Sequence, residues 1–154
     1  MFARKLLTHL ELHGDQLSEG LRQKIVASGN CTELLKKVPA DEQKRTMRDI
    51  YRQLTTWVLK DMRSVDEDYY VNLGARRFGQ GVPFSEVLAG VCAAREYFWE
   101  YIAQETLLDE PTDFWGSVKL LNAVDCCFDR ALRFTAMGYE KAERDRLAHA
   151  DHAA

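Results

Sequence analysis

Histidine, a side chain that often carries catalysis or metal binding, is rare in this chain and lies near its ends. Its 4 histidines are His9, His13, His149 and His152. His9 and His13 are four residues apart, which places both on one face of a helix, as in a pair of metal ligands or a phosphotransfer helix. No Glu-x-x-His motif is present, which disfavours a di-iron carboxylate bundle. We interpret both as edge residues of an amphipathic helix and keep a histidine phosphotransfer-like bundle as an alternative function.

Motifs for nucleophilic catalysis and phosphate binding are missing from the sequence. There is no Gly-x-Ser-x-Gly elbow, and the stretch GARRFGQG at 74–81 lacks the Lys-Ser/Thr ending and the preceding strand of a P-loop. The 4 cysteines, Cys31, Cys92, Cys126 and Cys127, have no Cys-x-x-Cys spacing, so we expect small core residues and no metal or redox site. The sequence therefore predicts no catalytic residue, no metal, no cofactor and no enzyme.

Arg95 is a charged residue on a helix face that is otherwise apolar. The apolar members of that face are Phe84, Val87, Leu88, Val91, Cys92, Phe98, Trp99 and Ile102. Because burying an unpaired guanidinium is costly, Arg95 should have an acidic partner. Asp125 is the expected partner if the two flanking helices form an antiparallel hairpin centred near Leu108 and Asp109. Such a pair either sets the helix register or anchors a ligand in a cavity.

Four aromatic residues are candidates for lining such a cavity: Phe84, Trp99, Phe114 and Phe128. They either fill the core or, with Arg95 and Asp125, bound a ligand pocket. A carrier of a small apolar ligand is therefore a second alternative function.

Small side chains occupy another side of the helix that carries Arg95, at Ala89, Gly90, Ala93 and Ala94. Small residues allow two helices to approach closely. This face is therefore a candidate contact with another helix, either within the chain or across the two-fold axis of a dimer.

The elements that must position these residues are all predicted to be helices, because apolar residues recur at helical spacing and strand-like alternation is missing. We expect helices over residues 3–27, 32–37, 41–63, 66–78, 83–102 and 112–147. Gly79 and Gly81 end one helix and Pro83 begins the next, so residues 76–88 form a defined turn that we call the corner. The prediction is one all-α domain over residues 3–147 and a disordered tail over residues 148–154.

Charge and composition limit the kinds of partner that the chain is expected to bind. The chain has 154 residues, of which 46% are hydrophobic, and a net charge of −3 with no basic cluster. Nucleic acid and anionic membranes are therefore not expected as partners. No apolar run is long enough to span a bilayer, and the N-terminal residues become charged too soon for a signal peptide. We expect a cytoplasmic protein.

The corner and the helix that follows it resemble a known pattern. Arg77, Gly81, Val82, Pro83, Glu86, Val87, Arg95 and Trp99 stand at matching positions within the stretch YYVNLGARRFGQGVPFSEVLAGVCAAREYFWEYI at 69–102. This stretch resembles the N-terminal sensor domain of the RsbR family, the co-antagonists of the stressosome. The resemblance implies a globin-like helical bundle that lacks haem, forms a dimer and ends in a long helix leading to a STAS domain.

Two departures qualify what the resemblance implies. Residues 14–148 contain no histidine that could serve as the proximal ligand of a haem, which supports a non-haem bundle. No STAS segment follows the long helix, so we expect output through a separate, unidentified signalling protein. The expected function is that of a non-enzymatic regulatory domain acting as a homodimer through protein–protein contacts.

Overall fold

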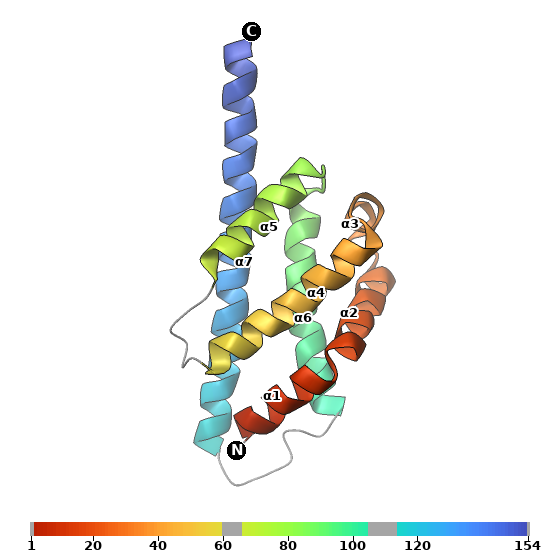
Figure 1. The fold of residues 1–154 in the computed structure, drawn as a ribbon, viewed down its shortest axis with the longest axis vertical. Helices are drawn as coiled ribbons and strands as arrows, with labels where there is room; N and C mark the ends of the chain where they lie inside the picture. The colour runs from red at the N-terminus through yellow and green to blue at the C-terminus, as the bar shows by residue number, and fades with distance from the viewer. Residues whose placement is uncertain (1, 60–65, 105–113, 154) are drawn as a thin grey trace.

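The chain folds into helices that pack around a single core, with one helix much longer than the others (Figure 1). The computed structural model describes residues 2–59, 66–104 and 114–153, apart from the side chains of residues 2, 3, 6, 59 and 114–117. The helices are α1 Phe2–Leu12, α2 Gly14–Ser28, α3 Thr32–Lys37, α4 Ala40–Leu59, α5 Glu67–Gly79, α6 Phe84–Gln104 and α7 Phe114–Ala153. The described ranges contain no strand, which confirms the predicted all-α, globin-like bundle with a long C-terminal helix.

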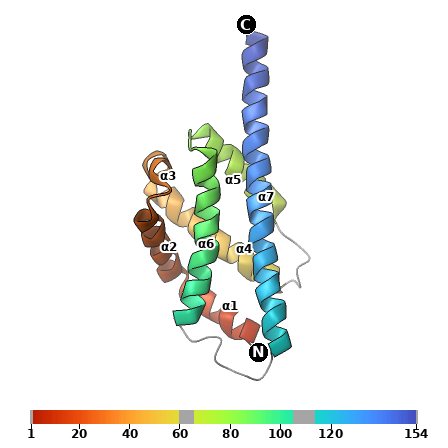
Figure 2. The same cartoon turned by 180° about the vertical axis from the view of Figure 1, so that it is seen from behind.

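Two long antiparallel helices, α6 and α7, lie side by side along the molecule (Figure 2). α5 crosses α7 in the most extensive contact between any two described helices, and α2 packs against both α4 and α6. The apolar residues on the buried side of α7 include Leu120, Val124, Cys127, Ala131 and Phe134. Their helical spacing is what directs that face of α7 into the core.

The crossing of α5 and α7 depends on two glycines. A Cβ placed on Gly74 would lie 2.0 Å from the carbonyl oxygen of Thr135, and one placed on Gly138 would lie 1.9 Å from the carbonyl oxygen of Val71. Both distances are far below van der Waals contact, so only glycine permits this approach. The backbones of the two helices therefore touch directly at this crossing.

The N-terminal helix differs from its prediction. A single helix over residues 3–27 was expected, but the chain breaks at His13, whose φ of −117° and ψ of 21° are not helical. Gly14 follows the break and weakens a helix interior by about 1 kcal/mol relative to alanine. The change of direction at this break separates α1, which contacts α4, from α2, which packs against both α4 and α6.

The far end of the chain also differs from its prediction. Residues 148–154 were expected to be disordered, but α7 remains helical through Ala153, and residues 143–153 are all exposed. Alanine, arginine and other strong helix formers dominate this segment, so it can continue the helix without a core beneath it. The end of α7 therefore projects beyond the bundle (Figure 1).

Among the described helices, none combines the length and hydrophobicity needed to cross a bilayer. The predicted ends of two helices at residues 60–63 and 112–113 lie outside the described residues, as do Leu108 and Asp109.

Candidate functional site

The corner is held in shape by its own backbone. Gly81 has a φ of 76°, the left-handed conformation that glycine adopts at little cost. Its N–H donates to the carbonyl of Phe78 at 2.9 Å, and the N–H of Val82 donates to the carbonyl of Arg77 at 3.1 Å. Pro83 lies directly before α6, and its carbonyl accepts from the N–H groups of residues 86 and 87 at 3.0 and 3.2 Å. Gly79 and Gly81 were both expected to end the preceding helix. Of these two, only Gly81 adopts the left-handed backbone conformation.

Glu86, in the first turn of α6, joins the corner to α3. Its carboxylate accepts hydrogen bonds from the backbone N–H groups of Glu33, at 3.3 Å, and Leu34, at 2.7 Å. A carboxylate at a helix N-terminus satisfies unpaired N–H groups and is favoured by the helix dipole. The ammonium of Lys37, at the other end of α3, donates to the carbonyl of Gly81 at 2.8 Å. The short helix α3 is therefore tied to the corner at both ends.

The corner also rests on α7. The hydroxyl of Tyr139 donates to the carbonyl of Val82 at 2.7 Å in a buried hydrogen bond. The ring of Tyr139 contacts Phe78 and Phe84, with centroids 5.3 and 4.9 Å away. Tyr139 thus connects the corner to α7 just before the helix leaves the bundle.

Arg77, at the start of the corner, is the buried charge of the molecule's described core, with a side chain only 4% exposed. Its guanidinium donates to the Glu42 carboxylate at 2.8 Å, to the Gln80 side-chain oxygen at 2.8 Å and to the Thr46 hydroxyl at 2.9 Å. The Gln80 amide donates in turn to the second oxygen of Glu42 at 2.9 Å. The charge is therefore both paired and hydrogen-bonded, as a buried guanidinium requires.

The pKa shifts of Glu42 and Arg77 have different causes. Desolvation alone would raise the pKa of Glu42, but hydrogen bonds from Arg77 and Gln80 and the charges of Arg77 and Arg76 lower it below the ordinary value of 4.5. Desolvation lowers the pKa of Arg77, and Glu42 opposes that effect. The two shifts do not mirror each other because Arg77 is more deeply buried than Glu42, whose side chain is 16% exposed. Both groups remain charged at neutral pH.

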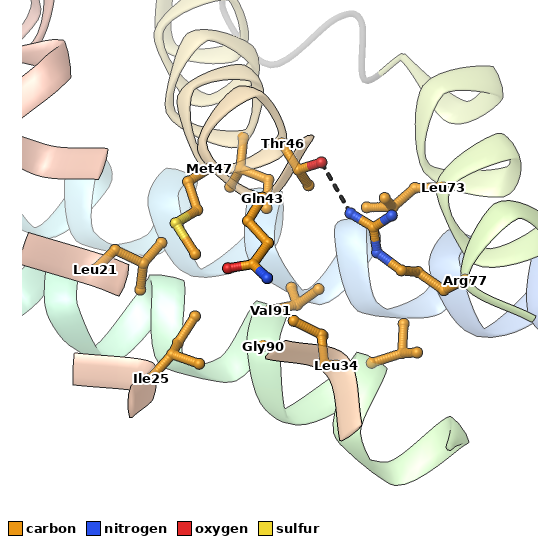
Figure 3. Close-up of a pocket in the computed structure, with 12 residues that line it drawn as sticks. Leu21, Ile25, Leu34, Gln43, Thr46, Met47, Leu73, Arg77, Gly90 and Val91 are labelled. Carbon is orange, nitrogen blue, oxygen red and sulfur yellow. Dashed lines mark hydrogen bonds between the residues drawn. The ribbon is translucent and has the colours of Figure 1, made fainter. Parts of the chain in front are cut away.

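A cavity of about 50 Å³ lies beside Arg77, between α2, α3, α4, α5 and α6 (Figure 3). Its walls are mainly apolar and include Leu21, Ile25, Leu34, Met47, Leu73 and Val91. The polar groups at its boundary belong to Gln43, Thr46 and Arg77. The Gln43 amide nitrogen donates to the carbonyls of Leu35, at 3.1 Å, and Val38, at 2.8 Å, while its amide oxygen is buried and accepts no hydrogen bond from the described residues.

The comparisons with known proteins address the same segment. A family model described as the N-terminal domain of the RsbT co-antagonist protein RsbRD matches residues 15–154. The chain belongs to this family. The match includes the corner, Arg77 and all of α7, and supports a stressosome-type sensor domain. Comparisons with curated proteins and with solved structures gave no match.

In this RsbRD N-terminal domain, Arg95 does not pair with Asp125 as predicted. Arg95 donates instead to Asp129 at 3.2 Å, and the indole nitrogen of Trp99 donates to Asp125 at 3.4 Å. The two contacts share one antiparallel register, shifted by about one helical turn from the predicted hairpin. The side chains of Arg95 and Asp129 are 33% and 67% exposed. The pair lies at the surface and anchors nothing in the cavity beside Arg77.

Three of the four predicted aromatic pocket residues lie apart from the two cavities described for this chain. Phe128 is buried in the core, Phe84 contacts Tyr139, and Trp99 contacts the ring of Phe98. The side chain of Phe114 lies outside the described residues. The second cavity, of about 600 Å³, is a hollow between the α1–α2 break and α4 and is lined by other residues.

The small-residue face of α6 makes contacts within the chain. Ala93 and Ala94 are buried, and the hydroxyl of Tyr51 on α4 donates to the carbonyl of Ala94 at 3.0 Å. Gly90 lines the cavity beside Arg77, and Ala89 packs against the core as a half-buried residue. At these positions the structure shows internal helix packing.

The histidine pair on α1 has a neighbour that the sequence did not indicate. The rings of His9 and His13 are 4.4 Å apart, and the Nε2 atom of His9 lies within hydrogen-bonding distance of the Tyr101 hydroxyl. That contact occupies an atom through which a phosphotransfer histidine would react. Within residues 2–59, 66–104 and 114–153, no group of three or more His, Cys, Asp or Glu side chains is arranged to hold a metal ion.

Sequence reasoning missed Gln43 and Arg77 as site residues, although a signal existed for each. Arg77 follows buried Tyr70 by seven residues and buried Leu73 by four, and Gln43 precedes buried Met47 by four. The periodicity argument that was applied to Arg95 therefore applies equally to both.

Proposed function

We propose that this RsbRD N-terminal domain is a non-enzymatic, cytoplasmic regulatory domain that acts as a homodimer and transmits a signal along α7 to a separate signalling protein. Family membership supports the regulatory role. The single observation that carries the mechanism is the contact of the corner with α7 through Tyr139 and Val82. The net charge of −3 favours protein partners over nucleic acid or an anionic membrane.

The mechanism follows from how rigidly α5 and the corner engage α7. Backbone contact at Gly74 and Gly138 leaves no space for α5 to move alone, so a displacement of α5 must move α7 or slide along it. Tyr139, the residue that follows Gly138, adds a second attachment where α7 leaves the bundle. A change near Arg77 would thereby reach the exposed residues 143–153, which are available to a partner.

The dimer is tested by light scattering coupled to size-exclusion chromatography over a wide range of protein concentrations. We expect a molar mass near twice that of the 17.7 kDa chain. A strictly monomeric mass at the highest concentration contradicts the homodimer.

The coupling is tested by replacing Tyr139 with phenylalanine, which removes only the hydroxyl that binds Val82. We expect faster amide hydrogen exchange in the corner and in the adjoining turns of α7. Tyr69→Phe is the matched control, because the hydroxyl of Tyr69 donates to Asp49 at 3.2 Å and so connects α5 to α4. Unchanged exchange around Tyr139, or equal changes there in both variants, contradicts transmission through this contact.

A further inference from the structure

The amide oxygen of Gln43 is a buried acceptor without a partner. The residue is only 4% exposed, and its oxygen accepts no hydrogen bond from the described residues. The orientation of the amide is determined, because its nitrogen donates to two carbonyls, those of Leu35 and Val38. The opposite orientation would bring oxygen against oxygen. A buried acceptor left open in this way calls for a donor from outside the chain.

This amide reaches into the cavity beside Arg77. In Figure 3 the side chain of Gln43 extends from α4 into the space bounded by Leu21, Ile25 and Val91. The lining residues are buried except for Thr46 and Gly90, which are half-buried. A molecule that enters beside Thr46 and Gly90 would therefore meet the open acceptor within an apolar enclosure.

The size of the cavity limits its occupant. One water molecule needs roughly 10–15 Å³ of such space, and a cavity of about 150 Å³ holds benzene. At about 50 Å³, the cavity beside Gln43 accommodates a molecule of a few non-hydrogen atoms. A larger ring does not fit without movement of the helices.

The chemistry of the walls limits the occupant further. The guanidinium of Arg77 is already engaged by Glu42, Gln80 and Thr46, so the cavity offers no unpaired charge to an anion. Water requires two to four polar partners to be held well in a buried site, and Gln43 supplies one open acceptor. A molecule with one hydrogen-bond donor and a short apolar body satisfies the acceptor and fills the remaining space against Ile25 and Met47.

We propose that the cavity between α2, α3, α4, α5 and α6 binds a small uncharged molecule whose O–H or N–H group donates to the side-chain oxygen of Gln43 while its apolar part contacts Ile25 and Met47. The further step, that this ligand is the signal that the regulatory domain senses, rests on the proposed function. Its position suits that role, since Leu73 and Arg77 line the cavity from α5, the helix that touches α7.

The test compares two probes of equal size in the full chain. 2-Propanol carries a donor, whereas acetone has the same number of non-hydrogen atoms and only an acceptor. We expect 2-propanol to shift the methyl resonances of Ile25 and Met47 and the side-chain amide resonance of Gln43 saturably, with a dissociation constant on the order of millimolar. Acetone should bind at least about fivefold more weakly, because its oxygen opposes that of Gln43.

Gly90→Ala reduces the cavity without opposing the fold. A Cβ at Gly90 would lie 3.6 Å from Leu34 Cδ1, which is ordinary contact, so the variant should fold and bind 2-propanol at least about threefold more weakly. Gly79→Ala is the matched control, because its new methyl has nothing within 4 Å and lies outside the cavity, and it should bind as the wild type does.

Three results would overturn the inference: no saturable shift with either probe, which leaves water as the occupant; equal binding of both probes; or unchanged binding by Gly90→Ala. The binding measurement requires neither a dimer nor a partner protein. A monomeric chain that binds 2-propanol would therefore refute only the proposed dimer, and a dimer that does not bind it would refute only the ligand.

Discussion

Arg77 and Arg95 have similar positions in the sequence pattern and very different positions in the structure. Each interrupts an apolar helix face, yet Arg77 is buried in a network with Glu42, whereas Arg95 reaches the surface beside Asp129. Exposed ion pairs contribute about 0–1 kcal/mol to stability, so Arg95→Ala should have a small effect. For an interior ion pair, removing one partner is expected to cost about 3 kcal/mol or more. That expectation applies instead to Arg77.

Replacing Arg77 with alanine should lower the free energy of unfolding by about 3 kcal/mol, because it leaves the largely buried Glu42 carboxylate without its principal partner. Arg76→Ala is the control: Arg76 also contacts Glu42, at 3.1 Å, but its side chain is 48% exposed. That variant should lose less than about 1 kcal/mol. Urea unfolding monitored by circular dichroism measures both, and equal losses would contradict the burial argument.

The Glu42 carboxyl makes the free energy of unfolding depend on pH in the acidic range. Its folded pKa lies below the ordinary value of 4.5, so its contribution is complete above that value and is lost as pH falls through the folded pKa. The wild type should therefore lose more stability than Glu42→Gln between about pH 5 and about pH 3. Urea midpoints measured across this range test the difference, and parallel pH profiles for the two proteins would show that Glu42 is not responsible.

Helix packing makes the effect of a glycine substitution depend on the contact it faces. Gly138→Ala forces a methyl into the backbone of α5 at Val71 and should destabilise the protein by about 2 kcal/mol or more. Gly90→Ala makes only ordinary contact with Leu34 and should stabilise α6 by up to about 1 kcal/mol. Thermal unfolding of both variants is the measurement. A Gly138→Ala protein as stable as the wild type would mean that α5 and α7 do not touch.

For the molecule as a whole, the end of α7 projects beyond the bundle and should contribute little to the free energy of unfolding. Residues 148–153 are exposed, so deleting residues 148–154 should change the free energy of unfolding by less than about 0.5 kcal/mol. Deleting residues 139–154 also removes Tyr139, with its buried hydrogen bond to Val82, and should be clearly destabilising. Chemical denaturation of the two truncated chains checks this contrast. A large loss from the shorter deletion would indicate that the end of α7 packs against the bundle.

The helical class, most helix positions and the corner could be predicted from the sequence alone. These features depend on local properties: apolar spacing, the left-handed backbone of Gly81 and the placement of Pro83 before α6. The motif residues of the corner were also sufficient to indicate the family that the comparison identified. Gly14 indicated a weak point in the first helix, but the spacing of apolar residues along that helix did not show that it breaks.

Which charge is buried and where the cavity lies could not be predicted, because both depend on how the helices pack. Moving one helix along another by a turn keeps the same face inward, so periodicity could not distinguish Asp125 from Asp129 as the partner of Arg95. The open acceptor of Gln43 likewise depends on carbonyls at the end of α3 and on walls from five helices. Local sequence determines which face of a helix is buried, whereas the neighbours of that face depend on how the helices pack.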